Sequence, residues 1–405
     1  MAVGLKRLSQ LSPVDGVQIG VCKAGIKYPD RYDLTVVSID EGANVAGVFT
    51  KNQFCAAPVS VSKKHLSLNS PSASARYLVI NTGNANAGTG EQGISDALKC
   101  CEEIARLTQT SPQSVLTFST GVIGENLPMD RILAGLPTAI ENCKADNWVS
   151  AAEAIMTTDT MPKGFSTTFE CDGESVTISG IAKGSGMICP NMATLLSFIA
   201  TDAKISQDVL QEMLEKANNY SFNSITIDSD TSTNDSCVLI ATGKGKLVLD
   251  QYSDVFFEKL LALMKFLAQG LIRDGEGASK FIAVTVKNAN DEAECRQIAY
   301  TVAHSPLVKT AFFASDANWG RILAAVGRAG VEGLDVNKIN IHLNEVCIVE
   351  AGARSGNYTE EQGQAVMDKE DIEITIDIAR GDIFHTIWTS DLSHDYIKIN
   401  AEYRT

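Results

Sequence analysis

The chain has 405 residues, of which 44% are hydrophobic and 20% are charged. This composition is that of a globular protein with a well-buried core, and the length predicts two or three domains. The formal net charge of −15 argues against nucleic-acid binding, because such proteins normally carry a basic patch. It does not exclude an anionic small substrate held locally by a few lysines or arginines.

The sequence indicates neither a membrane span, nor a secretory signal, nor a metal cluster. The apolar stretches 187–200 and 256–271 are interrupted by polar residues, so neither reaches the ~20 apolar residues that a membrane helix needs. Residues 1–16 lack the apolar stretch of a signal peptide. The ten cysteines form no CxxC pair and the five histidines no HExxH pattern. We therefore expect reduced thiols, a cytoplasmic location and no bound metal.

The N-terminal two thirds of the chain are predicted to mix strands and helices. Gly, Asn and Pro separate short β-prone runs, which predicts strands at 32–40, 44–50, 57–62, 76–81, 115–119, 165–171, 175–182, 224–228 and 237–242. Apolar residues at helical spacing predict helices at 91–108, 128–143, 147–157, after Ser206 and at 253–274.

From Phe281 onward, strands and helices are predicted to alternate. The strands are expected at 281–287, 308–314, 339–349, 372–379 and 383–389, and the helices at 291–304, 318–329 and 359–368. The tail 396–405 is predicted to be a strand that ends in polar residues. The fold class is therefore expected to be α/β (α+β), with a core domain at 1–280 and a second α+β domain at 281–405.

The segment 183–203, KGSGMICPNMATLLSFIATDA, carries the strongest chemical signal. Its Gly-broken loop leads to Thr194, which opens an apolar, partly β-branched run. A threonine hydroxyl is a poor nucleophile unless a base lies within hydrogen-bonding distance. Cleavage of the chain directly before Thr194 supplies that base, because the freed α-amine has a reference pKa of ~8. The alternative is an ordinary Gly-rich turn that enters a buried strand.

Five further positions are candidates for a functional site. Thr120 and Gly121 end a predicted strand, where a hydroxyl and a glycine amide can hold an oxyanion. Lys183 can bind a substrate carboxylate or lower the pKa of a nearby amine. Glu276 follows a long helix in a Gly-flanked loop and can meet a ligand ammonium, and Thr157 stands at the end of a predicted helix. Each also fits an ordinary role in a turn or on the surface.

The acidic turn 228–235, DSDTSTND, suggests calcium at first sight. It lacks the glycine at the sixth loop position and has Leu239 where an EF-hand places its bidentate glutamate. We therefore reject calcium. Two interpretations stay open, a turn that braces an active centre and an ordinary polar turn.

With these residues identified, the whole chain resembles the ornithine acetyltransferases, the glutamate N-acetyltransferase family of the cyclic arginine pathway. The segment 183–203 matches the signature of that family closely. Further motifs follow in the expected order: STGVIG, TTDT, DSDTSTND, DGEGASKF, NWGRI and the C-terminal N-x-x-Y-x-T. Small departures occur at Cys189, Leu195, Ser229 and 315–317, none of which has a presumed chemical role.

The resemblance implies a precursor that cleaves itself between Ala193 and Thr194 into an α chain (1–193) and a β chain (194–405). It implies layered sheets and helices of N-terminal-nucleophile appearance, with a topology of its own. Thr194 is then the nucleophile, and Thr120 and Gly121 stabilise the oxyanion. The substrate-contacting positions implied are Thr157, Lys183, Thr194, Glu276, Asn400 and Thr405, with the tail returning to the active site.

The activity implied is transfer of an acetyl group from N2-acetylornithine to glutamate through an acetyl-threonine intermediate, without a cofactor. The family suggests an assembly of two α and two β chains and no nucleic-acid or membrane partner. Whether acetyl-CoA also serves as an acetyl donor stays open. The alternatives are a self-cleaving aminopeptidase or amidase, in which water accepts the acyl group, and an uncut binding protein.

Overall fold

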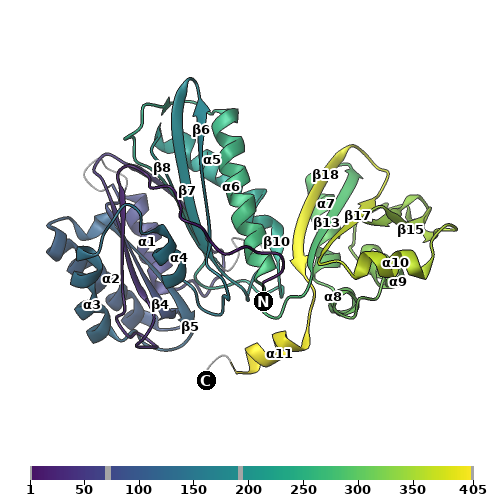
Figure 1. Ribbon diagram of the computed structural model, residues 1–405, viewed down its shortest axis with the longest axis horizontal. Coiled ribbons are helices and arrows are strands. Elements are labelled where there is room, and N and C mark those ends of the chain that lie inside the picture. Colours follow the sequence, from purple (N-terminus) through teal and green to yellow (C-terminus); the bar gives the residue numbers. More distant parts are fainter. Residues whose placement is uncertain (1, 69–73, 190–194, 403–405) are drawn as a thin grey trace. The chain divides into compact units, whose positions relative to one another are not determined.

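The computed structural model describes residues 2–68, 74–189 and 195–402. The chain divides into two compact units (Figure 1). The core unit comprises Arg7–Asn223 and Thr231–Leu271, and the C-terminal unit comprises Met1–Lys6, Ser224–Asp230 and Ile272–Thr405. The C-terminal unit thus takes in two short segments that an uninterrupted domain at 281–405 does not include.

The core unit contains two large β-sheets. The four-stranded sheet has the order β1-β2-β4-β5, with β1 Val17–Cys22, β2 Leu34–Ile39, β4 Tyr77–Asn84 and β5 Val115–Val122. The five-stranded sheet has the order β3-β11-β8-β7-β6, with β3 Asn44–Phe49, β6 Lys163–Cys171, β7 Glu174–Lys183, β8 Leu196–Thr201 and β11 Ser236–Ala241. Strands β9 Lys204–Ile205 and β12 Val248–Leu249 form a small third sheet.

The two large sheets share one apolar core. Phe118 of β5 and Phe198 of β8 meet edge to face across it, with ring centroids 5.0 Å apart. Helix α4 (Trp148–Ala154) packs into the same core, while α2 (Gly90–Thr108) and α3 (Met129–Glu141) cover the other face of the four-stranded sheet.

Helices also accompany the five-stranded sheet. Leu263 and Leu267 of α6 (Asp254–Arg273) lie against Gly180 on β7, and α5 (Gln207–Asn219) runs along the edge strand β3. Helix α1 (Ala57–Ser67) contacts β5 and α2. The core unit is therefore a layered α/β sandwich, which confirms the expected fold class.

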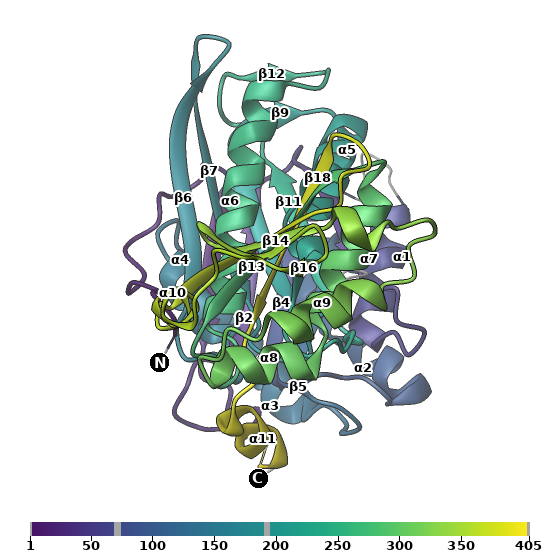
Figure 2. The same ribbon diagram turned by 90° about the vertical axis from the view of Figure 1, so that its right-hand side faces the viewer.

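The C-terminal unit is built on one seven-stranded sheet of order β10-β18-β13-β17-β14-β15-β16. Its strands are β10 Ile225–Thr226, β13 Phe281–Ala289, β14 Asn340–Leu343, β15 Val346–Glu350, β16 Ala353–Arg354, β17 Asp371–Asp377 and β18 Ile383–Ser390. Its helices are α7 Glu292–Ala303, α8 Pro306–Phe313, α9 Trp319–Gly327, α10 Glu360–Met367 and α11 His394–Ala401. Helices α7 and α9 contact each other, and α7 packs on β13 and β18 (Figure 2).

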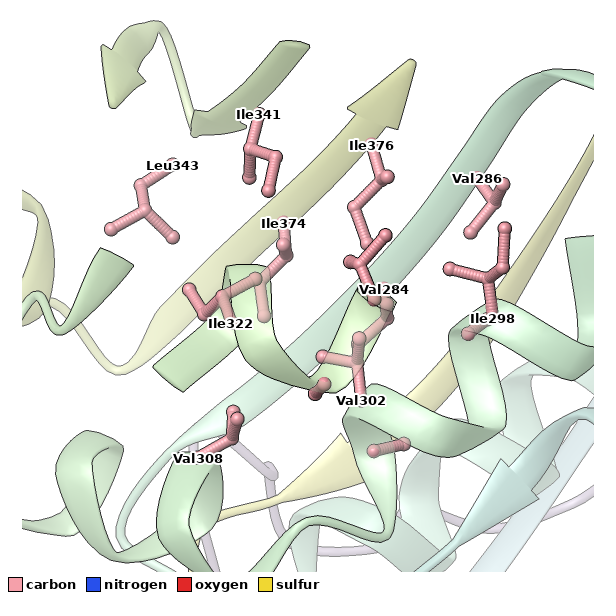
Figure 3. Packing of buried hydrophobic residues seen from close by; sticks show 14 of the residues in the cluster. Val284, Val286, Ile298, Val302, Val308, Ile322, Ile341, Leu343, Ile374 and Ile376 are labelled. Carbon is pink, nitrogen blue, oxygen red and sulfur yellow. The ribbon is translucent and has the colours of Figure 1, made fainter. Parts of the chain in front are cut away.

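Branched aliphatic side chains fill the space between this sheet and its helices. Val284 and Ile374 point from β13 and β17 toward Val302 and Ile322 on α7 and α9 (Figure 3). β-Branched residues suit a pleated surface that is buried on one face. The C-terminal unit thus has the α+β character that the alternating pattern predicted.

Three predicted strands are helices in the structure, and these predictions were wrong. The segment 57–62 belongs to α1, the segment 308–314 to α8, and most of the described tail to α11. In α8 and α11 the start is set by local capping, because Ser305 accepts a hydrogen bond from the Val308 amide and Ser393 from the Tyr396 amide. In α1 no side chain caps the start, but proline stands in its first turn, where its fixed φ suits a helix.

The described parts of the chain contain no helix that is long and apolar enough to cross a membrane. Within the same residues, no group of three or more His, Cys, Asp or Glu side chains is placed to hold a metal ion. The ten cysteines all lie among the described residues, and none of them is joined to another by a disulfide bond.

Candidate functional site

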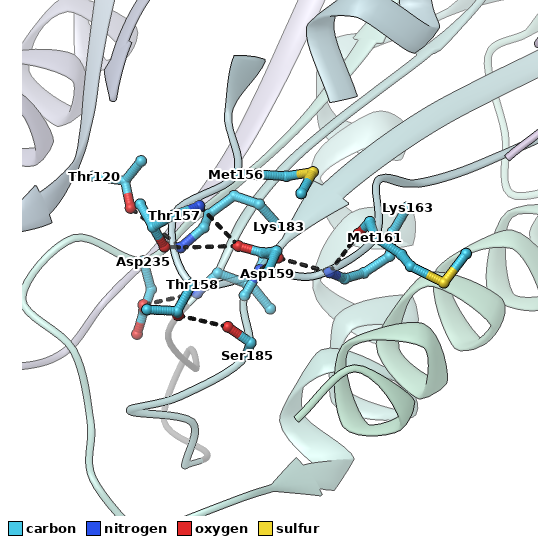
Figure 4. A network of polar contacts seen from close by, with 12 residues as sticks. Thr120, Met156, Thr157, Thr158, Asp159, Met161, Lys163, Lys183, Ser185 and Asp235 are labelled. Carbon is cyan, nitrogen blue, oxygen red and sulfur yellow. Dashed lines mark hydrogen bonds and ion pairs between the residues drawn. The ribbon is translucent and has the colours of Figure 1, made fainter. Parts of the chain in front are cut away.

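The end of β7 brings Lys183 to two threonine hydroxyls. Its Nζ donates to Thr157 Oγ1 over 2.8 Å and to Thr120 Oγ1 over 3.2 Å (Figure 4). Thr120 lies in β5 of one sheet, Lys183 ends β7 of the other sheet, and Thr157 follows α4. The packing of the two sheets therefore assembles a lysine–threonine cluster from residues that are distant in sequence, in which Lys183 and Thr120 are buried and Thr157 is half-buried. Only 7% of the Lys183 side chain is exposed, so its charge acts in a low-dielectric setting.

Gly121 occupies a place that no other residue can fill without a shift of the backbone. Its φ is +134°, and a Cβ at this position would lie 2.2 Å from the carbonyl carbon of Gly83 and 2.5 Å from the amide nitrogen of Asn84. The pairing of β4 with β5 is irregular at the same point. The glycine of STGVIG is thus required by a close approach of two strands, next to Thr120.

A buried carboxylate, Asp159, connects the cluster to its surroundings. Its Oδ1 accepts hydrogen bonds from Lys163 Nζ over 2.6 Å and from the Gly184 amide over 2.7 Å. Its Oδ2 accepts one from the Thr157 amide over 3.0 Å and lies 3.9 Å from Lys183 Nζ. Burial alone would raise the pKa of this carboxyl. The two ammonium groups and these hydrogen bonds outweigh burial and hold the pKa below its usual range.

A second buried carboxyl, Asp235, contacts the first described residue after the signature loop. The Leu195 amide donates to Asp235 Oδ1 over 3.0 Å. Burial raises the pKa of Asp235 well above its usual value, although the Leu195 amide, the Ser232 side chain and the Lys183 charge oppose this. Its Oδ2 is buried without a hydrogen-bond partner among the residues that the structure describes.

The turn that ends at Asp235 is tied to the same region of the core unit. Asn234 Nδ2 donates to the carbonyl oxygens of Ala85 and Ser119 over 2.6 and 2.9 Å. Ser119 directly precedes Thr120 in β5. Residues 231–235 therefore brace the end of β5, which favours the first of the two interpretations of this turn.

In the C-terminal unit, α11 brings Asn400 to Glu276. Asn400 Nδ2 donates to Glu276 Oε2 over 2.8 Å, and the Tyr396 hydroxyl donates to Asp228 Oδ2 over 3.2 Å. Gly277 has a φ of +69°, and a Cβ on it would lie 2.5 Å from Ser393 Oγ. A glycine beside Glu276 therefore allows the start of α11 to pack closely on this loop.

Asp391 fixes the other side of the loop that carries Glu276. Its Oδ1 accepts hydrogen bonds from the amides of Ser279 and Lys280 over 2.8 and 2.9 Å. Its Oδ2 accepts a further bond from the Ser279 hydroxyl over 2.5 Å. The loop is therefore anchored by the residue that follows β18.

The predicted site residues thus form two groups, each defined within its own unit. Thr120, Gly121, Thr157 and Lys183 gather in the core unit, and Glu276 contacts Asn400 in the C-terminal unit. Ala193, Thr194 and Thr405 lie outside the described residues. Sequence reasoning missed Asp159 and Asp235 as individual site residues. Their only local signal was a position inside the motifs TTDT and DSDTSTND.

Buried carboxyl groups with shifted pKa values, such as Asp159 and Asp235, cluster at the functional sites of enzymes. The family model of the ArgJ family matches residues 18–405, and the chain belongs to this family. This membership confirms the resemblance that the sequence motifs indicated.

Individual relatives agree with this assignment. The chain is 54% identical over 410 residues to the "Arginine biosynthesis bifunctional protein ArgJ" of Pseudomonas fluorescens (strain Pf0-1), with 100% of both chains covered. The protein of that name from Pseudomonas syringae pv. tomato gives the same identity and coverage. Among solved structures, the ArgJ protein of Bacillus halodurans is 35% identical, with a TM-score of 0.47 over 49% of this chain and 95% of that one.

Proposed function

We propose that this chain is a glutamate N-acetyltransferase that transfers an acetyl group from N2-acetylornithine to glutamate. The observation that carries the proposal is the buried Lys183 ammonium on the hydroxyls of Thr120 and Thr157, in a chain that belongs to the ArgJ family. Arginine biosynthesis, which is part of the names of the Pseudomonas relatives, supports these two amino acids as substrates.

The first reaction of the proposal is self-cleavage between Ala193 and Thr194. The Thr194 hydroxyl oxygen attacks the Ala193 carbonyl carbon, an ester forms, and the peptide C–N bond breaks as the proton moves to the freed amine. Water then hydrolyses the ester, which leaves a carboxylate on Ala193 and a free α-amine on Thr194. The contact between the Leu195 amide and Asp235 supports the proposal, because it fixes the residue directly after Thr194.

The second reaction is a two-step acetyl transfer. The Thr194 hydroxyl attacks the acetyl carbonyl of N2-acetylornithine, its proton passes through the α-amine to the departing ornithine nitrogen, and an acetyl ester forms. The amine of glutamate then attacks this ester and regenerates the hydroxyl. Thr120 and Gly121 are proposed to stabilise the oxyanion in both steps, and one such donor typically lowers the barrier by ~3–4 kcal/mol.

The remaining roles are proposed from the resemblance and from the charges of the groups. Lys183 offers an ammonium to a substrate carboxylate, and Glu276 offers a carboxylate to a substrate ammonium. Substrate contacts are proposed at Thr157, Lys183, Thr194, Glu276, Asn400 and Thr405. An assembly of two α and two β chains and a cytoplasmic location belong to the same proposal. The word "bifunctional" in the relatives' names favours acetyl-CoA as a second acetyl donor.

Replacement of the nucleophile tests the cleavage step. Thr194→Ala is expected to remain a single chain and to lose acetyl transfer, while Thr194→Ser keeps a hydroxyl and is expected to process itself. Intact mass after purification distinguishes the one-chain product from two fragments. Two fragments from Thr194→Ala would overturn the self-cleavage step.

The acyl acceptor separates the transferase from a hydrolase of the same architecture. The protein is incubated with N2-acetylornithine, with and without glutamate, and acetate and N-acetylglutamate are measured. A transferase yields N-acetylglutamate only when glutamate is present. Release of acetate at the same rate in both samples would favour the amidase alternative. Acetylation of glutamate from acetyl-CoA, measured in parallel, tests the second donor.

A further inference from the structure

The carboxylate of Asp159 joins the two segments that carry Thr157 and Lys183. It accepts a hydrogen bond from the Thr157 amide over 3.0 Å and another from the Gly184 amide over 2.7 Å. One amide belongs to the chain after α4, and the other directly follows β7. One side chain thus fixes the backbone at both positions from which the threonine hydroxyl and the lysine ammonium project.

The same carboxylate also acts on the charge of Lys183. Asp159 Oδ2 lies 3.9 Å from Lys183 Nζ, which is an ion-pair distance but too long for a hydrogen bond. The hydrogen bonds of the ammonium to Thr157 and Thr120 are shorter, at 2.8 and 3.2 Å. Asp159 therefore stabilises the positive charge while the ammonium stays directed at the threonine hydroxyls.

Lys163 gives this carboxylate a permanent counter-ion. Lys163 Nζ lies 2.6 Å from Asp159 Oδ1 and also donates to the Met161 carbonyl oxygen over 3.0 Å. Only 2% of the Lys163 side chain and none of the Asp159 side chain are exposed. The Asp159 carboxylate is thus shared between two ammonium groups, of which that of Lys163 is the nearer.

We infer that Asp159 is a positioning residue that holds Lys183 and Thr157 ready for the carboxylate of an amino-acid substrate, with Lys163 as its fixed counter-ion. The inference rests on the proposed function, in which Lys183 and Thr157 contact the substrate. It adds two buried residues that act through Lys183 and Thr157 rather than on the substrate itself.

The test distinguishes two roles of Asp159. In one role it positions Lys183 and Thr157, and in the other it only neutralises the charge of Lys163. Asp159→Asn alone leaves Lys163 without its counter-ion, which is strongly destabilising for a buried pair. The double variant Asp159→Asn/Lys163→Met removes both charges and is therefore the decisive protein. Its Tm, its intact mass and its KM and kcat for N2-acetylornithine are compared with those of the unmodified chain.

If Asp159 positions Lys183, the double variant keeps a Tm close to that of the unmodified chain. Its KM for N2-acetylornithine rises at least tenfold, with a smaller change in kcat. The alkaline limb of its kcat/KM profile moves to lower pH, because a buried ammonium without a nearby carboxylate loses its proton more readily. A double variant with an unchanged KM and pH profile would overturn the inference, since Asp159 would then only neutralise Lys163.

A further variant covers the case in which the double variant does not fold. Asp159→Glu keeps the charge but displaces the carboxylate by one methylene, so positioning predicts a raised KM with a retained Tm, and an unchanged KM contradicts it. Failure of the proposed function is recognised separately, because the unmodified chain would then form no N-acetylglutamate. Calorimetric binding of glutamate to the unmodified chain and to Asp159→Glu then decides the inference without turnover, and equal affinities would overturn it.

Discussion

Leu195 donates its backbone N–H to the buried carboxyl group of Asp235, with 3.0 Å between the nitrogen and Oδ1. Leu195 is the residue directly after Thr194, and Asp235 ends the polar turn that begins at Asp228. The same turn reaches β5 through Asn234 and the carbonyl oxygen of Ser119. One turn therefore connects the residue that follows the proposed cleavage position with the strand that carries Thr120 and Gly121.

Removal of this contact is expected to slow self-cleavage. Asp235→Ala eliminates the acceptor for the Leu195 amide, and we expect at least a tenfold slower loss of the intact chain. Asp235→Asn keeps an oxygen acceptor, so its rate should lie between those of Asp235→Ala and the unmodified chain. The intact and cleaved masses are followed over time after synthesis. Asp230→Ala, at an exposed position of the same turn, is the control, and an equal rate in Asp235→Ala and this control would contradict the prediction.

The two buried carboxyl groups of the core unit are expected to affect stability in opposite directions as pH changes. The pKa of Asp159 is lower in the folded protein than in the unfolded chain, where it is ~3.9. The ionised carboxylate therefore stabilises the fold fully above pH ~3.9, and this stabilisation is lost as the pH falls below that value. The pKa of Asp235 is higher in the folded protein than in the unfolded chain. Above pH ~3.9 the unfolded chain therefore binds fewer protons than the folded protein, and the stability decreases as the pH rises.

Thermal midpoints measured from pH 2 to pH 8 test this difference. Relative to the unmodified chain, Asp235→Asn should gain stability toward pH 8, because it lacks the carboxyl that must ionise. Asp159→Asn/Lys163→Met should gain relative stability as the pH falls below ~3.9, because it has no carboxylate to protonate. If Tm changed with pH in the same way in all three proteins, neither pKa shift would contribute to the stability of the fold.

Substitution of Gly121 is expected to be far more damaging than substitution of Gly124 in the same motif. A Cβ at Gly121 would lie 2.2 Å from the backbone of Gly83, whereas a Cβ at Gly124 meets nothing within 4 Å. Both glycines have positive φ, at +134° and +85°, so Gly124→Ala isolates the conformational cost of about 1–2 kcal/mol. For Gly121→Ala the steric overlap adds about 1–3 kcal/mol and displaces the backbone beside Thr120.

Urea unfolding and acetyl transfer measured together check this prediction. Gly124→Ala should retain most of its activity per folded molecule, while Gly121→Ala should lose activity by about 100-fold or more if its amide stabilises the oxyanion. Equal activities per folded molecule would remove Gly121 from the proposed oxyanion site.

The contact between α11 and Glu276 is expected to affect substrate binding without affecting self-cleavage. Asn400→Ala removes the hydrogen bond of 2.8 Å to Glu276 Oε2, so we expect a KM for N2-acetylornithine that is higher by about fivefold to tenfold. Lys398→Ala, an exposed position on the same helix, is the matched control. Intact mass should show complete cleavage in both variants. A KM in Asn400→Ala equal to that of the control would remove Asn400 from the substrate contacts.

Local sequence determined most of the individual elements and the chemical types of the site residues. Helical spacing of apolar residues predicted α2 and α6 to within two residues of their ends, because a helix repeats its buried face every 3.6 residues. Acyl transfer can use a hydroxyl, an accessible backbone amide and an ammonium group. The sequence offers these groups beside glycines, at Thr120, Gly121 and Lys183. The same local rules failed at α8 and α11, where a short alternation of apolar residues suggested strands. Both segments are helices, because Ser305 and Ser393 cap their N-termini.

Only the tertiary structure decided which of these groups meet. Asp159 and Asp235 have no distinctive local pattern, since their partners Gly184 and Leu195 lie 25 and 40 residues away in sequence. Periodicity reports which face of an element is buried, but it carries no information about the element that covers that face. The lysine–threonine cluster exists because two sheets pack on one core around Phe118 and Phe198. Contacts of this kind depend on the whole fold, so burial and the resulting pKa shifts of both carboxyl groups follow from packing alone.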